Sequence, residues 1–187
     1  MAVDRLSPSR GGLTGVLLVG GESSRFGSPK ALARLRGETL AERAWRTLDE
    51  ACDERIAVGK GDLALPFEVL VESAEPRAPI AGVVTGLRAA ANEVAVFLPV
   101  DCPLVTPALL RELGEHAAVP QTGPLPGAYT KADLPELERR LARRDYTLRG
   151  VNLRVREVDV RLLVDVDTPV VLSALEEHLT ALDDNRA

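Results

Sequence analysis

The chain has 187 residues, of which 45% are hydrophobic and only 3% aromatic, and its formal net charge is -5. This length suits one α/β domain with a core built mainly from Leu, Val and Ala, and the composition gives no sign of disorder. The negative charge argues against a nucleic-acid surface, which needs a clustered excess of Lys and Arg. No run reaches the ~18 apolar residues of a membrane span and no signal peptide precedes the first apolar run, so we expect a cytoplasmic protein without membrane contact.

The polar residues 1–12 predict a disordered lead-in, followed by a single domain over residues 13–187. Short apolar runs, separated by helical patterns, predict strands near 14–19, 55–59, 67–72, 94–99 and 162–166. Strands that alternate with helices predict a three-layer, mostly parallel, doubly wound α/β sheet. The less regular, proline-containing stretch 119–160 is expected to form a lobe for an acceptor substrate.

The first predicted strand runs into a loop rich in Gly and Ser that ends in two cations. Its candidate ligand-binding residues are Gly20, Gly21, Ser23, Ser24, Arg25 and Lys30. Adjacent glycines let the backbone turn without a Cβ, and α/β sheets bind ligands at the carboxyl ends of parallel strands. The serines and loop N–H groups can point at phosphate oxygens, while the cations supply positive charge. The loop therefore predicts a triphosphate site.

The glycine spacing excludes two common nucleotide motifs. A Walker A loop has four residues between its glycines and Lys directly after the second, whereas five residues separate Gly21 from Gly27 and Lys30 comes three positions later. A dinucleotide-binding G-x-G-x-x-G turn also fails, because Gly20 and Gly21 are adjacent. For the loop taken alone, the alternative is a flexible connection with solvated cations.

A carboxylate closes the apolar run 94–100. Asp101 is followed by Cys102 and Pro103, and the strand cannot continue through the prolines that come next. Asp101 is therefore expected at the same sheet edge as the glycine loop. Mg2+ prefers oxygen ligands and usually takes one or two carboxylates plus substrate phosphates, so Asp101 is a candidate ligand. The alternative is a turn-capping role.

Two more carboxylates follow the predicted strand over 162–166. Asp165 and Asp167 stand at i and i+2, which face the same side of a strand. One of them would complete a metal site with Asp101. The alternative is that Asp167 only favours the positive end of a last helix opened by Thr168 and Pro169.

These stretches together resemble the molybdenum cofactor guanylyltransferases, the molybdopterin-guanine dinucleotide biosynthesis protein A family. The resemblance rests on Gly-Gly-x-Ser-x-Arg-x-Gly-x-x-Lys, a strand ending in Asp-x-Pro, and a late Asp-x-Asp-Thr-Pro, and it extends from about residue 14 to about residue 175. Segments 78–87 and 124–129 resemble the family's Gly-Pro-Leu-x-Gly and Pro-Leu-x-Gly-x-Tyr elements. The resemblance implies a Rossmann-like fold of the nucleotide-diphospho-sugar transferase type. It also implies Mg2+-dependent transfer of GMP from GTP to the phosphate of molybdopterin, with release of pyrophosphate.

The resemblance also assigns roles to single residues. The implied nucleotide-binding residues are Val19, Gly20, Gly21, Ser23, Ser24, Arg25, Lys30, Glu72, Gly82 and Asp101. Arg25, Lys30 and Asp101 would be catalytic, with Asp101 as principal Mg2+ ligand. Glu72 would lie near the purine base, and Asp165 and Asp167 near the second substrate or the metal. The implied partners are GTP, molybdopterin and proteins that deliver or insert the molybdenum cofactor.

The chemistry explains why no catalytic base stands out. An acceptor phosphate is already an anionic nucleophile at neutral pH, so the reaction needs positioning and charge neutralisation. We accordingly expect His116 and His178 on the surface. Cys52 and Cys102 show no metal-ligand spacing and are interpreted as packing residues.

Alternatives remain for the base of the donor nucleotide and for the activity of the protein. Asp165 and Asp167 stand where guanylyltransferases often carry Asn, which resembles the related cytidylyltransferases, whereas adjacent Gly20 and Gly21 favour the guanylyl type. A nucleotide-binding regulator without turnover is a second alternative, and a dinucleotide-dependent oxidoreductase is disfavoured by the glycine spacing. A basic cluster on a predicted helix over 134–144 is interpreted as a solvated face paired with Glu136 and Glu138, rather than as a partner site.

Overall fold

The protein is described by a computed structural model that covers residues 11–20, 26, 29–59, 63–72, 76 and 78–184. A five-stranded sheet forms its centre, in the order β5-β4-β1-β6-β8. Its strands are β1 (Leu13–Leu18), β4 (Glu54–Gly59), β5 (Val69–Val71), β6 (Val94–Pro99) and β8 (Gly127–Thr130). The first four run parallel, and β8 pairs antiparallel with β6. The predicted, mostly parallel sheet is thus confirmed.

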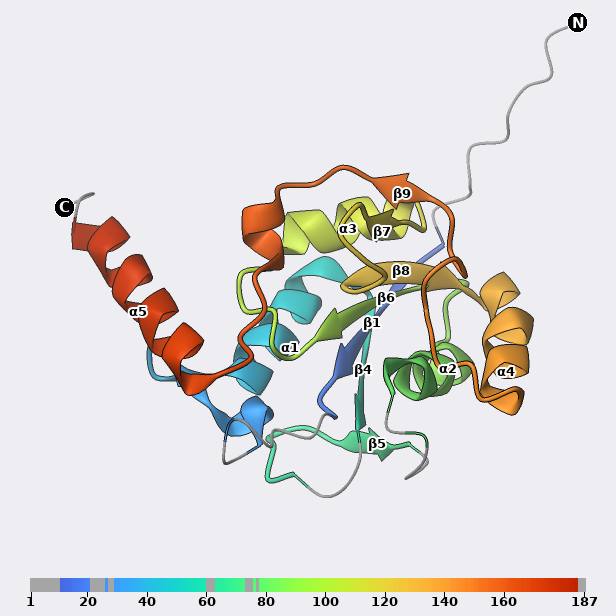
Figure 1. Cartoon of the computed structure of the whole chain (residues 1–187), viewed down its shortest axis with the longest axis horizontal. Coiled ribbons are helices and arrows are strands. Elements are labelled where there is room, and N and C mark those ends of the chain that lie inside the picture. The colour runs from blue at the N-terminus through green and yellow to red at the C-terminus, as the bar shows by residue number, and fades with distance from the viewer. Residues whose placement is uncertain are drawn as a thin grey trace, which may run out of the picture.

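Helices cover both faces of this sheet (Figure 1). One face packs against α1 (Leu40–Ala51) and α3 (Pro107–Glu115), and the other against α2 (Pro79–Ala89) and α4 (Leu134–Ala142). Successive residues of a strand point to opposite faces, so Leu17 joins the first core and Val16 the second. The three predicted layers follow directly from these two cores.

Smaller elements surround the central sheet. β2 (Arg34–Leu35) pairs antiparallel with β3 (Glu38–Thr39), and β7 (Val119–Pro120) pairs parallel with β9 (Val155–Arg156). Short 3-10 helices cover Lys30–Leu32, Lys131–Asp133 and Val160–Leu163. The last helix, α5 (Pro169–Asp184), extends away from the sheet at the left of Figure 1. Among the described residues, no helix is long and apolar enough to cross a membrane.

The predicted strand over 162–166 is wrong. Asp159 accepts a hydrogen bond from the backbone N–H of Arg161 at 3.0 Å and so opens the 3-10 helix Val160–Leu163. Beyond it, the N–H of Val166 donates to the carbonyl oxygen of Asp101 at 2.8 Å, without a strand ladder. The apolar run is real, because its two leucines pack against the first core, but they do so from a helical turn.

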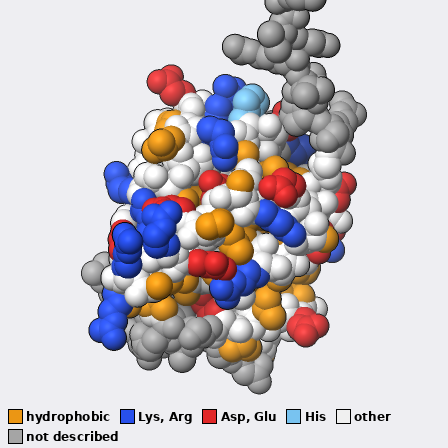
Figure 2. All heavy atoms as spheres, turned by 90° about the vertical axis from the view of Figure 1, so that its right-hand side faces the viewer, with side chains coloured by type: hydrophobic (Ala, Val, Ile, Leu, Met, Phe, Trp, Pro, Cys, Tyr) orange, Lys and Arg blue, Asp and Glu red, His pale blue; other side chains and the backbone are white. Residues whose placement is uncertain are grey.

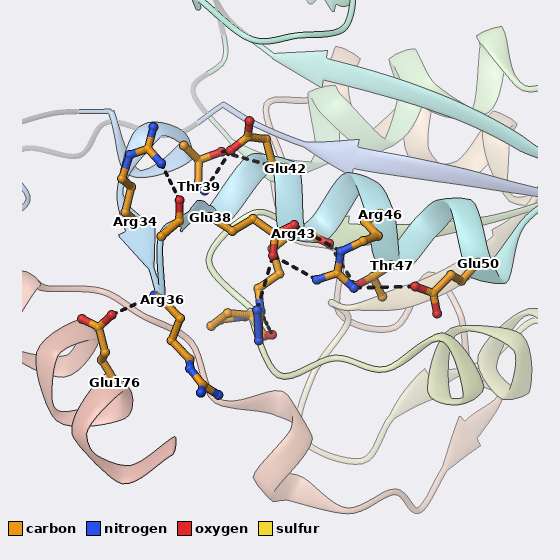
Figure 3. Close-up of polar contacts among 12 residues, drawn as sticks. Arg34, Arg36, Glu38, Thr39, Glu42, Arg43, Arg46, Thr47, Glu50 and Glu176 are labelled. Carbon is orange, nitrogen blue, oxygen red and sulfur yellow. Dashed lines mark hydrogen bonds and ion pairs between the residues drawn. The ribbon is translucent and has the colours of Figure 1, made fainter. Parts of the chain in front are cut away.

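Threonine hydroxyls cap the starts of two helices. The Thr106 hydroxyl accepts from the N–H of Leu109 at 3.3 Å at the start of α3, and the Thr168 hydroxyl accepts from the N–H of Val171 at 3.3 Å at the start of α5. α5 also contacts the turn between β2 and β3, where the N–H of Arg36 donates to Glu176 at 2.8 Å (Figure 3). Side-chain caps of this kind depend on local sequence, so the sequence predicts them well.

A reciprocal capping box opens α1 (Figure 3). The Thr39 hydroxyl accepts from the N–H of Glu42 at 3.1 Å, and the Glu42 carboxylate accepts from the N–H of Thr39 at 3.0 Å. Two backbone donors that the helix itself leaves without partners are satisfied in this way.

Replacing Thr39→Ala is therefore expected to lower the free energy of unfolding by about 1 kcal/mol. Chemical denaturation of the whole chain measures this value. Thr39→Ser keeps the hydroxyl and should restore most of the loss, whereas the exposed Thr180→Ala in α5 should change stability little. An unchanged free energy for Thr39→Ala would show that the capping box does not stabilise α1.

The basic cluster lies on α4 and the residues after it. Its members are Arg139, Arg140, Arg143 and Arg144. Glu136 forms ion pairs with Arg139 and Arg140, as predicted, while Glu138 pairs with Arg88 of α2 instead. On this side of the molecule, Lys and Arg side chains are interspersed with Asp and Glu rather than gathered alone (Figure 2). The face is one of mixed charge.

Candidate functional site

Lys30 and Asp101 meet at the carboxyl edge of the central sheet. Lys30 begins the 3-10 helix Lys30–Leu32, and Asp101 lies just past the end of β6. The Lys30 Nζ atom is 3.1 Å from Asp101 Oδ2 and 2.6 Å from Asp167 Oδ1. Three segments that are far apart in the chain therefore bring one ammonium and two carboxylates together. The expected convergence of Lys30 and Asp101 is confirmed.

Backbone hydrogen bonds hold Asp101 in place. The N–H of Val100 donates to the carbonyl oxygen of Leu18 at 3.1 Å, and the N–H of Val166 donates to that of Asp101 at 2.8 Å. The first bond attaches the turn to β1, and the second attaches the late segment around Asp167 to the same turn. The fold thus sets the position of both carboxylates relative to the central strand.

Cys102 packs beneath Asp101. Its side chain is buried, and its thiol donates a weak hydrogen bond to Asp101 Oδ1 at 3.8 Å. Burial raises the pKa of the Cys102 thiol, and the negative charges of Asp101 and Asp165 raise it further. A thiol that stays protonated is neither a nucleophile nor a thiolate ligand, so the packing interpretation is confirmed.

Lys30 carries a full positive charge. Burial by itself lowers the pKa of its ammonium, but hydrogen bonds and charge from Asp167 and Asp101 outweigh this effect and raise the pKa above the usual value of 10.5. The Lys30 side chain is 17% exposed, against 26% for Asp101 and 55% for Asp167. The ammonium is therefore enclosed on the protein side while Asp167 faces solvent.

A second group of predicted residues lies at the end of β1, on the side of β4. Gly82 of α2 is buried, and a Cβ there would lie 2.9 Å from Leu18 Cδ2 and 3.3 Å from Glu72 Oε2. Glu72 follows β5, and its N–H donates to the carbonyl oxygen of Gly59 at 2.9 Å. Buried Val19 donates its N–H to Val58 at 2.9 Å. Glycine at position 82 thus allows α2 to approach β1 and Glu72 closely.

The remaining predicted residues are placed in part. Exposed Gly20 follows Val19, whereas Gly21, Ser23, Ser24 and Arg25 lie outside the described residues. His116 and His178 are exposed, as expected. The sequence does not predict the contact between Asp167 and Lys30, because the motif around Asp167 resembles a strand end and no local pattern pairs the two residues.

The donor set suits Mg2+. Mg2+ commonly binds through one or two carboxylates and completes its shell with water and substrate phosphate oxygens. Asp101 and Asp167 are two such carboxylates, and both contact the same ammonium. Within the part of the chain that the structure describes, no group of three or more His, Cys, Asp or Glu side chains is arranged to hold a metal. A metal here would therefore take its remaining ligands from water and from a substrate.

Comparison with known proteins identifies the family. The MobA-like NTP transferase domain matches residues 15–151. A probable molybdenum cofactor guanylyltransferase of Opitutus terrae is 34% identical, over 84% of this chain and 87% of its own. A molybdenum cofactor guanylyltransferase of Desulfosudis oleivorans is 29% identical, over 85% and 87%.

A solved structure supports the same fold. The crystal structure of molybdopterin-guanine dinucleotide biosynthesis protein A from Archaeoglobus fulgidus has a TM-score of 0.76 at 22% identity, over 90% of this chain and 99% of that one. At that identity the likeness concerns the fold, while the sequence matches above concern the family. This chain is therefore a nucleotidyltransferase and belongs to the family of MobA-like NTP transferase domains.

Proposed function

We propose that this protein transfers GMP from GTP to the phosphate of molybdopterin and releases pyrophosphate, with Mg2+ as cofactor and in the cytoplasm. The observation that carries the proposal is the Lys30 ammonium beside Asp101, at the sheet edge where the Gly20 loop leaves β1. The curated names of the relatives at 29–34% identity support the guanylyl donor and the molybdenum cofactor as acceptor.

The residues of the chain would act mainly through charge and position. The anionic acceptor phosphate must approach the anionic α-phosphate while anionic pyrophosphate leaves. Fixed positive charge therefore lowers the barrier more than a general base would. Lys30, together with Arg25, would stabilise the departing pyrophosphate, and the loop from Gly20 to Ser24 would bind the phosphates through N–H and hydroxyl donors. Mg2+, held by Asp101 and Asp167, would supply further positive charge at the α-phosphate.

The guanine base of the nucleotide would lie at the end of β1, on the side of β4. Glu72 and Gly82 are neighbours there, with Val19 buried beside Gly59. A carboxylate accepts hydrogen bonds, and the Watson–Crick edge of guanine carries N–H donors at N1 and N2. Glu72 is therefore proposed to select guanine, while the small Gly82 leaves the backbone of α2 close to the ligand.

Residues 13–187 are proposed to act as one catalytic domain, with stretch 119–160 as the acceptor lobe. Proteins that deliver or insert the molybdenum cofactor are proposed as partners, because the product is a cofactor that another protein must receive.

A thermal-shift screen of the whole chain with GTP, CTP, ATP and UTP, each with Mg2+, tests which nucleotide base the protein prefers. A ligand at about 100 times its Kd stabilises the folded state by about 2.7 kcal/mol, or roughly 5–10 °C in melting temperature for a chain of this size. GTP is expected to give the largest shift. A larger shift with CTP would replace the guanylyl assignment by cytidylyl transfer, which the carboxylates at 165 and 167 favour. GTP binding without pyrophosphate release, in the presence of molybdopterin, would indicate a regulator instead.

A further inference from the structure

The Lys30 ammonium, which is proposed to bind phosphate, contacts two carboxylates. It lies between two carboxylates, 3.1 Å from Asp101 and 2.6 Å from Asp167. Carboxylate oxygens are also the ligands that a divalent metal would use at this edge of the sheet. The Lys30 ammonium therefore already offsets part of the negative charge of the oxygens that the metal needs.

We propose that Lys30 is a placeholder cation that holds Asp101 and Asp167 until a nucleotide arrives, so that divalent metal binds together with the triphosphate and not before it. This inference rests on the proposed function, and it adds an order of binding. Lys30 would move from the carboxylates to the phosphate oxygens as the metal takes its place.

The charges of the site support this exchange. Two carboxylates and one ammonium carry a net charge of about -1, against -2 without the ammonium, and a divalent cation would approach Lys30 at close range. The exposure of Asp167 moderates these interactions through solvent screening without cancelling them.

The lysine side chain is suited to such a movement. Its ammonium is a compact charge on a flexible four-carbon stem, so it can change partners without a shift of the backbone. A triphosphate offers it several acceptor oxygens in exchange for the two carboxylates. The two carboxylates would keep a cation beside them throughout, and exchange of the ammonium for a divalent metal would bring their local net charge from about -1 to about 0.

Titration of the whole chain with Mn2+ alone, followed by the electron paramagnetic resonance signal of free Mn2+, tests the proposal without nucleotide. Mn2+ is a suitable probe because, like Mg2+, it prefers oxygen ligands. Lys30→Gln is expected to bind Mn2+ at least about tenfold more tightly than the wild type, because the competing charge is gone. Lys30→Arg keeps a cation and should stay near the wild-type affinity, and Lys30→Gln with Asp101→Asn should lose the gain.

The matched control is Lys131→Gln, which removes an exposed lysine elsewhere and changes the net charge equally. An equal gain in this variant, or no gain in Lys30→Gln, would overturn the proposal. A second measurement uses the wild type, so it does not depend on the folding of a variant. The 13Cε resonance of Lys30 should stay unchanged in millimolar Mg2+ alone, and a shift there would also overturn the proposal. Neither measurement contains GTP, so the guanylyl proposal keeps its own test.

Discussion

Asp101→Asn is expected to reduce nucleotidyl transfer about a thousandfold or more and to leave the fold intact. The asparagine is nearly isosteric and can still accept a hydrogen bond from Lys30, but it lacks the charge that a metal ligand needs. The backbone bonds that hold the residue, through Val100 and Val166, do not involve the side chain. Pyrophosphate release from GTP with molybdopterin measures the loss.

Thermal unfolding of the same variant shows whether the loss is catalytic. The ion pair between Lys30 and Asp101 is partly exposed, so its removal should lower the melting temperature by a few degrees at most. Asp49→Asn provides a matched control, because Asp49 pairs with Arg55 near the start of β4, at the opposite edge of the sheet. Transfer by Asp101→Asn at close to the wild-type rate would remove Asp101 from the proposed metal site.

Lys30→Gln is expected to lower kcat/KM for pyrophosphate release about 100-fold to 1000-fold. The reason is the loss of a fixed positive charge where the leaving pyrophosphate gains negative charge. Burial lowers the pKa of Lys30, but the hydrogen bonds that its ammonium donates to the two carboxylates, and their negative charge, outweigh this effect and raise the pKa, so the side chain is protonated throughout the neutral range. The wild-type rate should therefore show no loss from lysine deprotonation near neutral pH.

The same variant separates metal affinity from catalysis. Lys30→Gln should bind Mn2+ more tightly than the wild type and yet transfer GMP more slowly, a combination that general misfolding would not produce. Lys30→Arg should recover part of the rate, and Lys131→Gln should keep all of it. A full rate for Lys30→Gln would show that the ammonium does not act on the departing pyrophosphate.

The local sequence by itself determined most of the elements. Buried parallel strands need continuous apolar residues, and four of the five predicted strands correspond to β1, β4, β5 and β6. The helix starts at Thr39, Thr106 and Thr168 follow from hydroxyl caps that act over three residues. Asp101 could be placed at the sheet edge for the same reason, because it directly follows an apolar strand and parallel strands end together.

Only the tertiary structure decided which side chains meet across that edge. Lys30 and Asp167 are 137 positions apart, and no local pattern pairs them. Likewise, Glu72 approaches Gly82 because α2 packs closely on β1. The run over 162–166 looked like a strand, but strands exist through ladders with partners, and here Asp159 favours a helical turn instead. Hydrophobic periodicity reports which residues are buried, whereas the partners of charged side chains depend on the packing of the whole chain.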